Sequence, residues 1–169
     1  MKGVAEFLII PLLIGLSAVL LPSDSHGRGT VSAMGTDFSE ADTQGDFAVL
    51  DSSGKKVPFR SFLGQKPLLV VFWASWCVEC RAEVPTLNRL FDDTEIRVLA
   101  VNLGENEQKV RAFISSFQVG YPVVRDPGWQ TSAAYRVLGI PACLLLDSEG
   151  RILYRGSSVP GNIAAYLRR

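Results

Sequence analysis

Long apolar runs alternate with amphipathic segments through the middle of the chain. The segments LLVVFW (68–73) and IRVLAVNL (96–103) are almost continuously apolar and rich in β-favouring residues. Such runs predict strands that are buried on both faces of a sheet. Apolar residues recur at helical spacing over 77–92 and again over 105–116, and this spacing predicts one amphipathic helix after each strand.

Shorter elements precede and follow this central part. Segment 47–59 has two apolar stretches around Ser-Ser-Gly-Lys, which predicts a β-hairpin. Residues 130–135 predict a short helix, 142–146 and 152–154 predict two strands joined by the turn DSEG, and 161–168 predicts a last helix. This order of strands and helices predicts an α/β fold with an N-terminal β-hairpin.

The first 22 residues have the pattern of an export signal. Lys2 precedes an apolar run from Phe7 to Leu21, and a polar exit follows it. About 20 apolar residues are needed to span a membrane, so a cleaved signal peptide and an uncleaved membrane anchor both remain open for 1–22. Either one predicts that the remainder lies outside the cytoplasm, where cysteine pairs can cycle through disulfides.

Residues 23–45 are rich in Ser, Gly, Thr and Asp and show no periodicity. This composition predicts a flexible tether, so the folded domain is expected at 46–169. His26, the only histidine of the chain, lies in the tether without a neighbouring metal ligand, and we interpret it as a solvated residue. The chain has 17 Lys plus Arg and 17 Asp plus Glu, without a basic cluster, which argues against a nucleic-acid partner.

The motif FWASWCVEC contains Cys77 and Cys80, separated by two residues. Such a pair can bind zinc, but a zinc site needs four ligands and the chain adds only Cys143 and His26, so we expect no metal. Covalent haem attachment needs a histidine directly after the second cysteine, where the chain has Arg81. A redox pair and a purely structural disulfide remain.

The position of Cys77 favours redox chemistry. It falls where the predicted strand ends and the helix begins, and the free backbone N–H groups at a helix start stabilise a thiolate. We therefore predict that Cys77 is the nucleophile, and that Cys80, one turn later and deeper, resolves the mixed disulfide. The carboxylate of Glu79 would oppose the thiolate unless it faces solvent.

These motifs resemble the thioredoxin superfamily over roughly residues 46–169. The resemblance rests on W-C-x-x-C after an apolar strand, Pro85 in the following helix, and Ile140-Pro141 before the next strand. Three further matches, R-A-E-V-P, Y-P-V-V-R-D-P and G-I-P-A-C-L-L-L-D-S-E-G-R-I, resemble the TlpA-, ResA- or DsbE-like branch. A peroxidase of this fold would carry Thr or Ser at position 74, where this chain has Ala74.

The resemblance implies a thioredoxin-like fold with a central mixed β-sheet flanked by helices. It also implies an extracytoplasmic thiol-disulfide oxidoreductase that uses no cofactor. Several members of this branch reduce the cysteines of apocytochrome c before haem attachment. The implied partners are client proteins with cysteines or disulfides, a membrane electron donor, and the inner membrane, which the N-terminal segment would contact.

The resemblance also assigns roles to particular residues. Ordinary thioredoxins have a buried Asp where this chain has Val71, so the proton acceptor must be another group. Glu83 matches a functional Glu of the branch and lies three residues after Cys80, on the same helical face. If it is half-buried, it can take the proton of Cys80; a merely solvated carboxylate is the alternative.

Three residues are expected to meet the substrate. Pro141 matches the cis-proline of the superfamily, which lies opposite the cysteine pair and leaves the backbone of Ile140 free to pair with an extended substrate. Trp76 offers either an apolar platform for substrate or simple packing, while Trp73 packs behind the site.

Cys143 departs from the family, which often has Thr at this position. Strand alternation places it on the same face as Pro141, and therefore beneath the active-site helix. A buried, inert thiol and a thiol able to pair with Cys80 both remain open.

The sequence thus predicts an extracytoplasmic thiol-disulfide oxidoreductase that reduces client proteins. A redox-inactive or metal-delivering binding module of the same fold is the alternative. The direction of electron flow and the client itself are not determined by the sequence.

Overall fold

The central strands form as the apolar runs predict. The structure is a computed structural model that describes residues 47–93 and 95–168. The strands are β1 (Ala48–Leu50), β2 (Lys56–Pro58), β3 (Leu68–Trp73), β4 (Arg97–Leu103), β5 (Val123–Asp126), β6 (Ala142–Leu146) and β7 (Ile152–Gly156). The helices are α1 (Val78–Phe91), α2 (Glu107–Phe117), α3 (Gln130–Ala134) and α4 (Ala164–Leu167), with a 3-10 turn η1 (Phe59–Phe62).

All seven strands of the described residues belong to one mixed sheet, in the order β2-β1-β5-β4-β3-β6-β7. The three inner strands β3, β4 and β5 are parallel, whereas the hairpins β1–β2 and β6–β7 join antiparallel at the two sides. All six residues of β3 are buried, because helices cover both faces of this part of the sheet. The predicted mixed sheet and N-terminal hairpin are confirmed.

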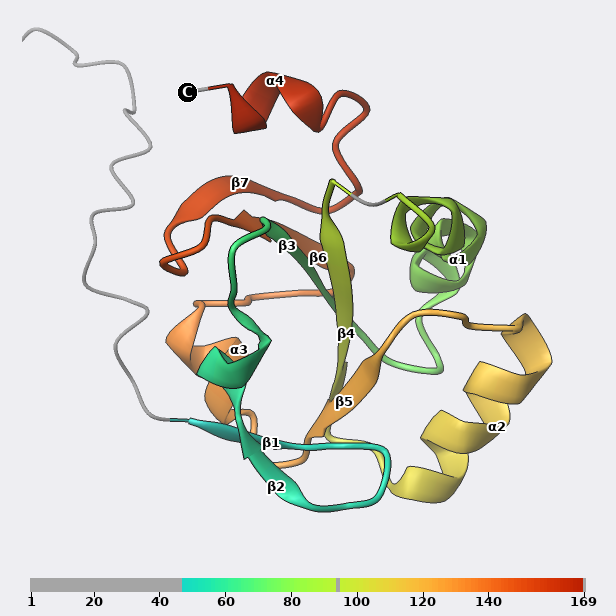
Figure 1. Cartoon of the computed structure of the whole chain (residues 1–169). Helices are drawn as coiled ribbons and strands as arrows, with labels where there is room; N and C mark the ends of the chain where they lie inside the picture. The colour runs from blue at the N-terminus through green and yellow to red at the C-terminus, as the bar shows by residue number, and fades with distance from the viewer. Residues whose placement is uncertain (1–46, 94, 169) are drawn as a thin grey trace, which may run out of the picture. The chain divides into compact units, whose positions relative to one another are not determined.

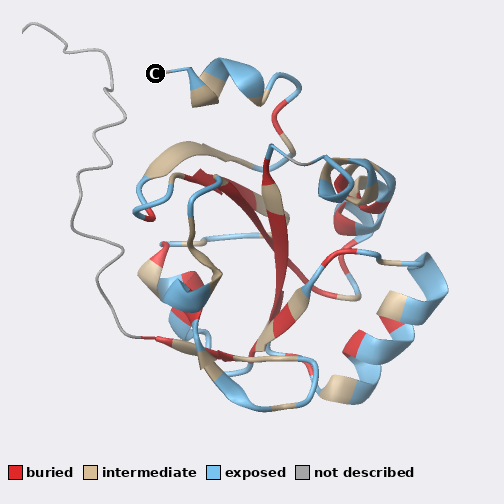
Figure 2. Cartoon of the chain, viewed as in Figure 1, coloured by how far each residue is buried: buried red, intermediate tan, exposed pale blue. Residues whose placement is uncertain are grey.

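The helices divide between the two faces of the sheet (Figure 1). Side chains from α1 and α2 pack with alternate residues of β3, such as Leu69 and Val71, and residues of α4 pack against the same cluster. On the opposite face η1 and Tyr135, which follows α3, pack against Val70 and Phe72. Figure 2 shows the resulting buried band along the sheet between exposed helical surfaces.

The ends of several elements differ from those expected. The second helix begins at Glu107 rather than at residue 105, with Asn106 as its N-cap. The last helix is only Ala164–Leu167, because the Gly-Asn pair at 161–162 precedes it and Asn162 caps the backbone instead. Strand β5 was not predicted: its four residues alternate in burial and are too few to stand out as a run.

The predicted signal or anchor at 1–22 and the tether at 23–45 lie outside the described residues. No helix within 47–93 and 95–168 is long and apolar enough to cross a membrane.

Candidate active site: a cysteine pair at the start of helix α1

Cys77 and Cys80 are joined by a disulfide bond at the N-terminus of α1. Cys77 is the N-cap residue of this helix, and its Sγ accepts a hydrogen bond of 3.1 Å from the backbone N–H of Cys80. Sulfur here takes the place that a Ser or Asp oxygen takes in an ordinary cap. The helix therefore directs one N–H group of its first turn, which has no partner within the helix, at the sulfur, as the sequence predicts.

Burial does not separate the two cysteines. Cys77 is 3% exposed and Cys80 is 4% exposed, so the expectation that Cys80 lies deeper is wrong. The reason is the cap itself, which turns the Cys77 sulfur back onto the first turn of the helix. Glu79, between them, is exposed, so its carboxylate is screened by water and opposes a thiolate only weakly.

The surface beside the pair is apolar and open. Trp76 and Val78, on either side of Cys77, are each 65% exposed. Trp73 is buried instead, and its ring centroid lies 4.3 Å from that of Phe113 in α2. Trp73 thus belongs to the core behind the site, whereas Trp76 is free to contact another molecule.

The segment before β6 approaches the same core. The Ile140–Pro141 peptide bond is cis, as the resemblance implies. Ile140 is half-buried and packs against the cluster that contains Cys77 and Cys80. Leu138, two residues earlier, is fully exposed.

Glu83 of α1 acts electrostatically on Cys143 of β6, which packs in the same buried cluster as residues of α1. Glu83 is half-buried, as its proposed role requires, and Cys143 is fully buried in β6. Burial raises the pKa of the Cys143 thiol to about 12, and the negative charge of Glu83 adds to this rise. Cys143 is also paired in register with Val71 of β3, so the two departures from the family, at positions 71 and 143, lie side by side on neighbouring strands.

A polar cluster that the sequence analysis missed holds the loop before Cys77. The Glu105 carboxylate accepts hydrogen bonds from the Ser75 backbone N–H at 2.7 Å, from the Ser75 hydroxyl at 2.6 Å and from the Asn102 side chain at 2.7 Å. The available signal was the pair Asn102 and Glu105, polar residues that close an otherwise apolar strand.

Glu105 is 8% exposed, so its charge needs these partners. Burial by itself would raise the pKa of its carboxyl group. The hydrogen bonds from Ser75 and Asn102, together with the charge of Lys109, outweigh burial and hold that pKa below its ordinary value. The carboxylate is therefore ionised at neutral pH.

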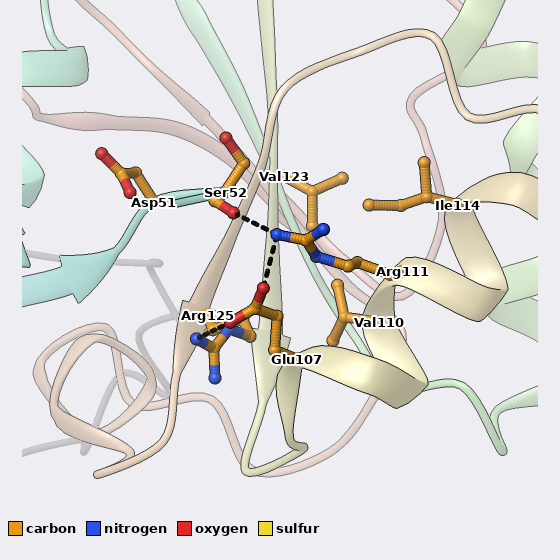
Figure 3. Close-up of a pocket in the computed structure, with 8 residues that line it drawn as sticks. All are labelled: Asp51, Ser52, Glu107, Val110, Arg111, Ile114, Val123 and Arg125. Atoms are coloured by element: carbon orange, nitrogen blue, oxygen red, sulfur yellow. Dashed lines mark hydrogen bonds and ion pairs between the residues drawn. The ribbon is translucent and has the colours of Figure 1, made fainter. Parts of the chain in front are cut away.

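A separate cavity of about 310 Å³ lies between the hairpin turn, α2 and β5. Figure 3 shows the carboxylate of Glu107 between two guanidinium groups, with Arg111 at 2.5 Å and Arg125 at 3.5 Å. Arg111 also donates to the carbonyl of Ser52 at 3.4 Å. Glu107 thus pairs with both guanidinium groups, and the Arg111 bond to Ser52 ties the hairpin to α2.

Known proteins place this site in a family. The sequence model of the AhpC/TSA family matches residues 41–155. The chain belongs to this family.

No group of three or more His, Cys, Asp or Glu side chains in the described part of the chain is arranged to hold a metal ion.

Three similar proteins illustrate the relationship. "Thiol-disulfide oxidoreductase ResA" of Bacillus subtilis (strain 168) is 31% identical over 119 residues, which cover 69% of this chain and 66% of the relative. A thioredoxin-like protein from Aeropyrum pernix superposes with a TM-score of 0.62 at 19% identity, covering 73% of this chain and 88% of that one.

The third is a secreted Mycobacterium tuberculosis disulfide oxidoreductase homologous to E. coli DsbE, with a TM-score of 0.60 at 20% identity. The match covers 73% of this chain and 93% of that chain. The two structures confirm the predicted thioredoxin-like fold, and the likeness to ResA confirms the predicted enzyme class, a thiol-disulfide oxidoreductase.

Proposed function

We propose that this protein reduces disulfides in client proteins outside the cytoplasm, with Cys77 as the nucleophile and Cys80 as the resolving cysteine. The observation that carries the proposal is the disulfide at the start of α1, where the Cys77 sulfur accepts the backbone N–H of Cys80. In the reduced protein the same N–H group stabilises a Cys77 thiolate.

The proposed reaction has two exchanges. The Cys77 thiolate attacks one sulfur of the client disulfide, forming a mixed disulfide and releasing the other client sulfur as a thiolate, which takes a proton from water. Cys80 then loses its proton to the Glu83 carboxylate and attacks the Cys77 sulfur. This closes the Cys77–Cys80 disulfide and releases the second client thiolate, so that two electrons pass to the client.

We assign Glu83 to the proton transfer because it is half-buried and one helical turn from Cys80. A half-buried carboxylate can act as a general base and accept a proton from a neighbouring group. The proton it accepts is lost to water after the client leaves, which restores the carboxylate.

Trp76, Ile140 and Pro141 are the proposed docking surface for the client. Trp76 presents an exposed ring beside Cys77. Ile140 precedes strand β6 and packs against the cluster around the pair, so an extended client segment that pairs with its backbone would lie next to the sulfurs.

The oxidised pair must be reduced again for turnover. We propose a membrane dithiol as electron donor, with the enzyme held at the inner membrane by its N-terminal segment. The apolar run at 7–21 supports this location, and cytochrome c maturation is the client pathway that the likeness to ResA suggests.

Reduction of insulin tests the redox role. The pre-reduced full chain should precipitate the insulin B chain, and a Cys77→Ala variant should not. Equal turnover by both proteins would contradict the assignment and favour the alternative, a redox-inactive or metal-delivering module.

Equilibration with glutathione tests the direction. If the protein reduces its clients, the reduction potential of the Cys77–Cys80 pair should lie well below that of oxidising thiol proteins. A value above about −150 mV would indicate a strong oxidant instead.

A further inference from the structure

The polar groups of Ser75 are bound on both sides of its peptide chain. Glu105 accepts its N–H and its hydroxyl, at 2.7 Å and 2.6 Å. From the other side, the Arg81 guanidinium donates to the Ser75 carbonyl through Nη2 at 2.7 Å and Nε at 3.2 Å. The steps proposed above use none of these contacts.

These bonds act on the turn that delivers Cys77 to the helix. The backbone N–H of Cys77 donates to the carbonyl of Ala74 at 3.1 Å, so Ser75 is the second residue of a four-residue turn. Fixing the peptide groups on both sides of Ser75 therefore fixes the direction in which the chain enters α1.

Glu105 is itself held by the sheet rather than by α1. Its carboxylate accepts from Asn102 of β4. Gly104 has a φ of +69°, and a Cβ atom there would lie 3.0 Å from the Trp129 ring. A glycine is needed for this turn because other residues rarely adopt such a φ. The groups that hold the acceptor are thus separate from the redox pair, and we expect Glu105 to keep its place when the disulfide is reduced.

The disulfide and the Glu105 hydrogen bonds both constrain the position of Cys77. In the oxidised protein the Cys77–Cys80 bond fixes the position of the Cys77 sulfur. After reduction that covalent constraint is gone, and the hydrogen bonds of Ser75, with the packing of the buried Ala74 and Cys77, keep the sulfur at the helix start.

We propose that Glu105 is a positioning residue for the reduced enzyme, and that its carboxylate holds the Ser75 turn so that the Cys77 thiolate remains capped by α1. The proposal rests on the proposed role of Cys77 as nucleophile. It makes Glu105 distinct from Glu83, which acts on the proton of Cys80.

The test compares Glu105→Gln with Glu107→Gln in the full-length, reduced protein. Both variants remove one negative charge at the start of α2, but only the first removes an acceptor of Ser75. The readout is the thiolate pKa of Cys77, from the pH dependence of its alkylation by iodoacetamide, with mass spectrometry to separate Cys77 from Cys80 and Cys143.

The direction in which the Cys77 pKa changes shows whether Glu105 acts by positioning the turn or only through its charge. Loss of a nearby negative charge alone lowers a thiol pKa, whereas loss of helix capping raises it. We expect Glu105→Gln to raise the Cys77 pKa and to slow alkylation at pH 7 about fivefold, the worth of one hydrogen bond. Glu107→Gln should leave both unchanged or lower the pKa slightly.

A Cys77 pKa that is unchanged or lowered in Glu105→Gln would overturn the proposal. If this variant does not fold, Ser75→Ala decides, because it removes the hydroxyl bond and keeps the backbone bond. It should raise the Cys77 pKa by a smaller amount, and no rise would also overturn the proposal.

Insulin reduction by the wild-type protein distinguishes the two proposals. If the wild type fails to reduce insulin while Glu105→Gln shifts the Cys77 pKa as expected, the proposed function fails and positioning stands. If insulin is reduced and the Cys77 pKa does not rise, positioning alone fails.

Discussion

The buried thiol of Cys143 should make the stability of the protein depend on pH in the alkaline range. Cys143 is fully buried, and burial raises its pKa from 9.0 to about 12, with Glu83 adding to the rise. The unfolded chain loses the thiol proton near the ordinary pKa, but the folded protein keeps it. The stability that this group contributes is therefore complete below the unfolded pKa and is lost as the pH rises towards the folded pKa.

The size of the effect follows from the two pKa values. Between pH 8 and pH 10 the folded thiol stays protonated, while the unfolded thiol passes through its pKa of 9.0. Linkage then gives a loss of about 1.4 kcal/mol in the free energy of unfolding over this interval from Cys143 alone. Burial also raises the pKa of Tyr121 and Tyr135 above the ordinary value of 10.0, so these groups add to the pH dependence and the difference between two proteins must be measured.

The assay is denaturant unfolding of the oxidised wild type and of Cys143→Ala at several pH values between 8 and 10. The Cys77–Cys80 disulfide removes the other two thiols from the titration. The alanine variant will be less stable at every pH because of its cavity, but the gap between the proteins should narrow by about 1.4 kcal/mol as the pH rises. Cys143→Val, closer in volume, should show the same slope as the alanine variant.

Parallel curves for wild type and variants would refute the reasoning, because they would show that the folded protein does not hold the thiol in its protonated form.

Three further predictions concern the site and its core. Cys80→Ser should accumulate a mixed disulfide with a client through Cys77, seen on a non-reducing gel, whereas Cys77→Ser should trap nothing; equal trapping would reverse the two roles. Glu83→Gln should slow oxidation of the reduced pair by a client disulfide about a hundredfold at neutral pH, followed by tryptophan fluorescence in stopped flow, and an unchanged rate would mean that Glu83 is only a helix carboxylate. Trp73→Ala should lower the free energy of unfolding by about 3–5 kcal/mol, because its buried ring packs on Phe113; a loss below about 1 kcal/mol in a denaturant titration would contradict that packing.

The fold was largely accessible from the sequence, with exceptions that have physical reasons. The runs at 68–73 and 96–103 predicted the inner strands, because a strand covered on both faces must be apolar throughout. Strand β5 was missed because its residues alternate between buried and half-buried over only four positions. The helix predicted from residue 105 begins at Glu107, because Glu105 is bound to Ser75 instead.

The cysteine pair and its place at a helix start were also accessible, since they depend on neighbours in the chain. The depth of the two sulfurs was not, because the cap turns the Cys77 sulfur into the helix, and no spacing rule gives the direction of a side chain.

What the sequence alone determined is local: the apolar periods, the hairpin, and Cys77 and Cys80 one helical turn apart. Only the tertiary structure decided which distant groups meet them. Glu105 reaches Ser75 across 30 residues, and Glu83 acts on Cys143 from another element. Those contacts depend on strand order, on the register between β3 and β6, and on the turn at Gly104. The motif alone therefore identifies the redox pair, whereas the residues that surround the pair depend on how the sheet assembles.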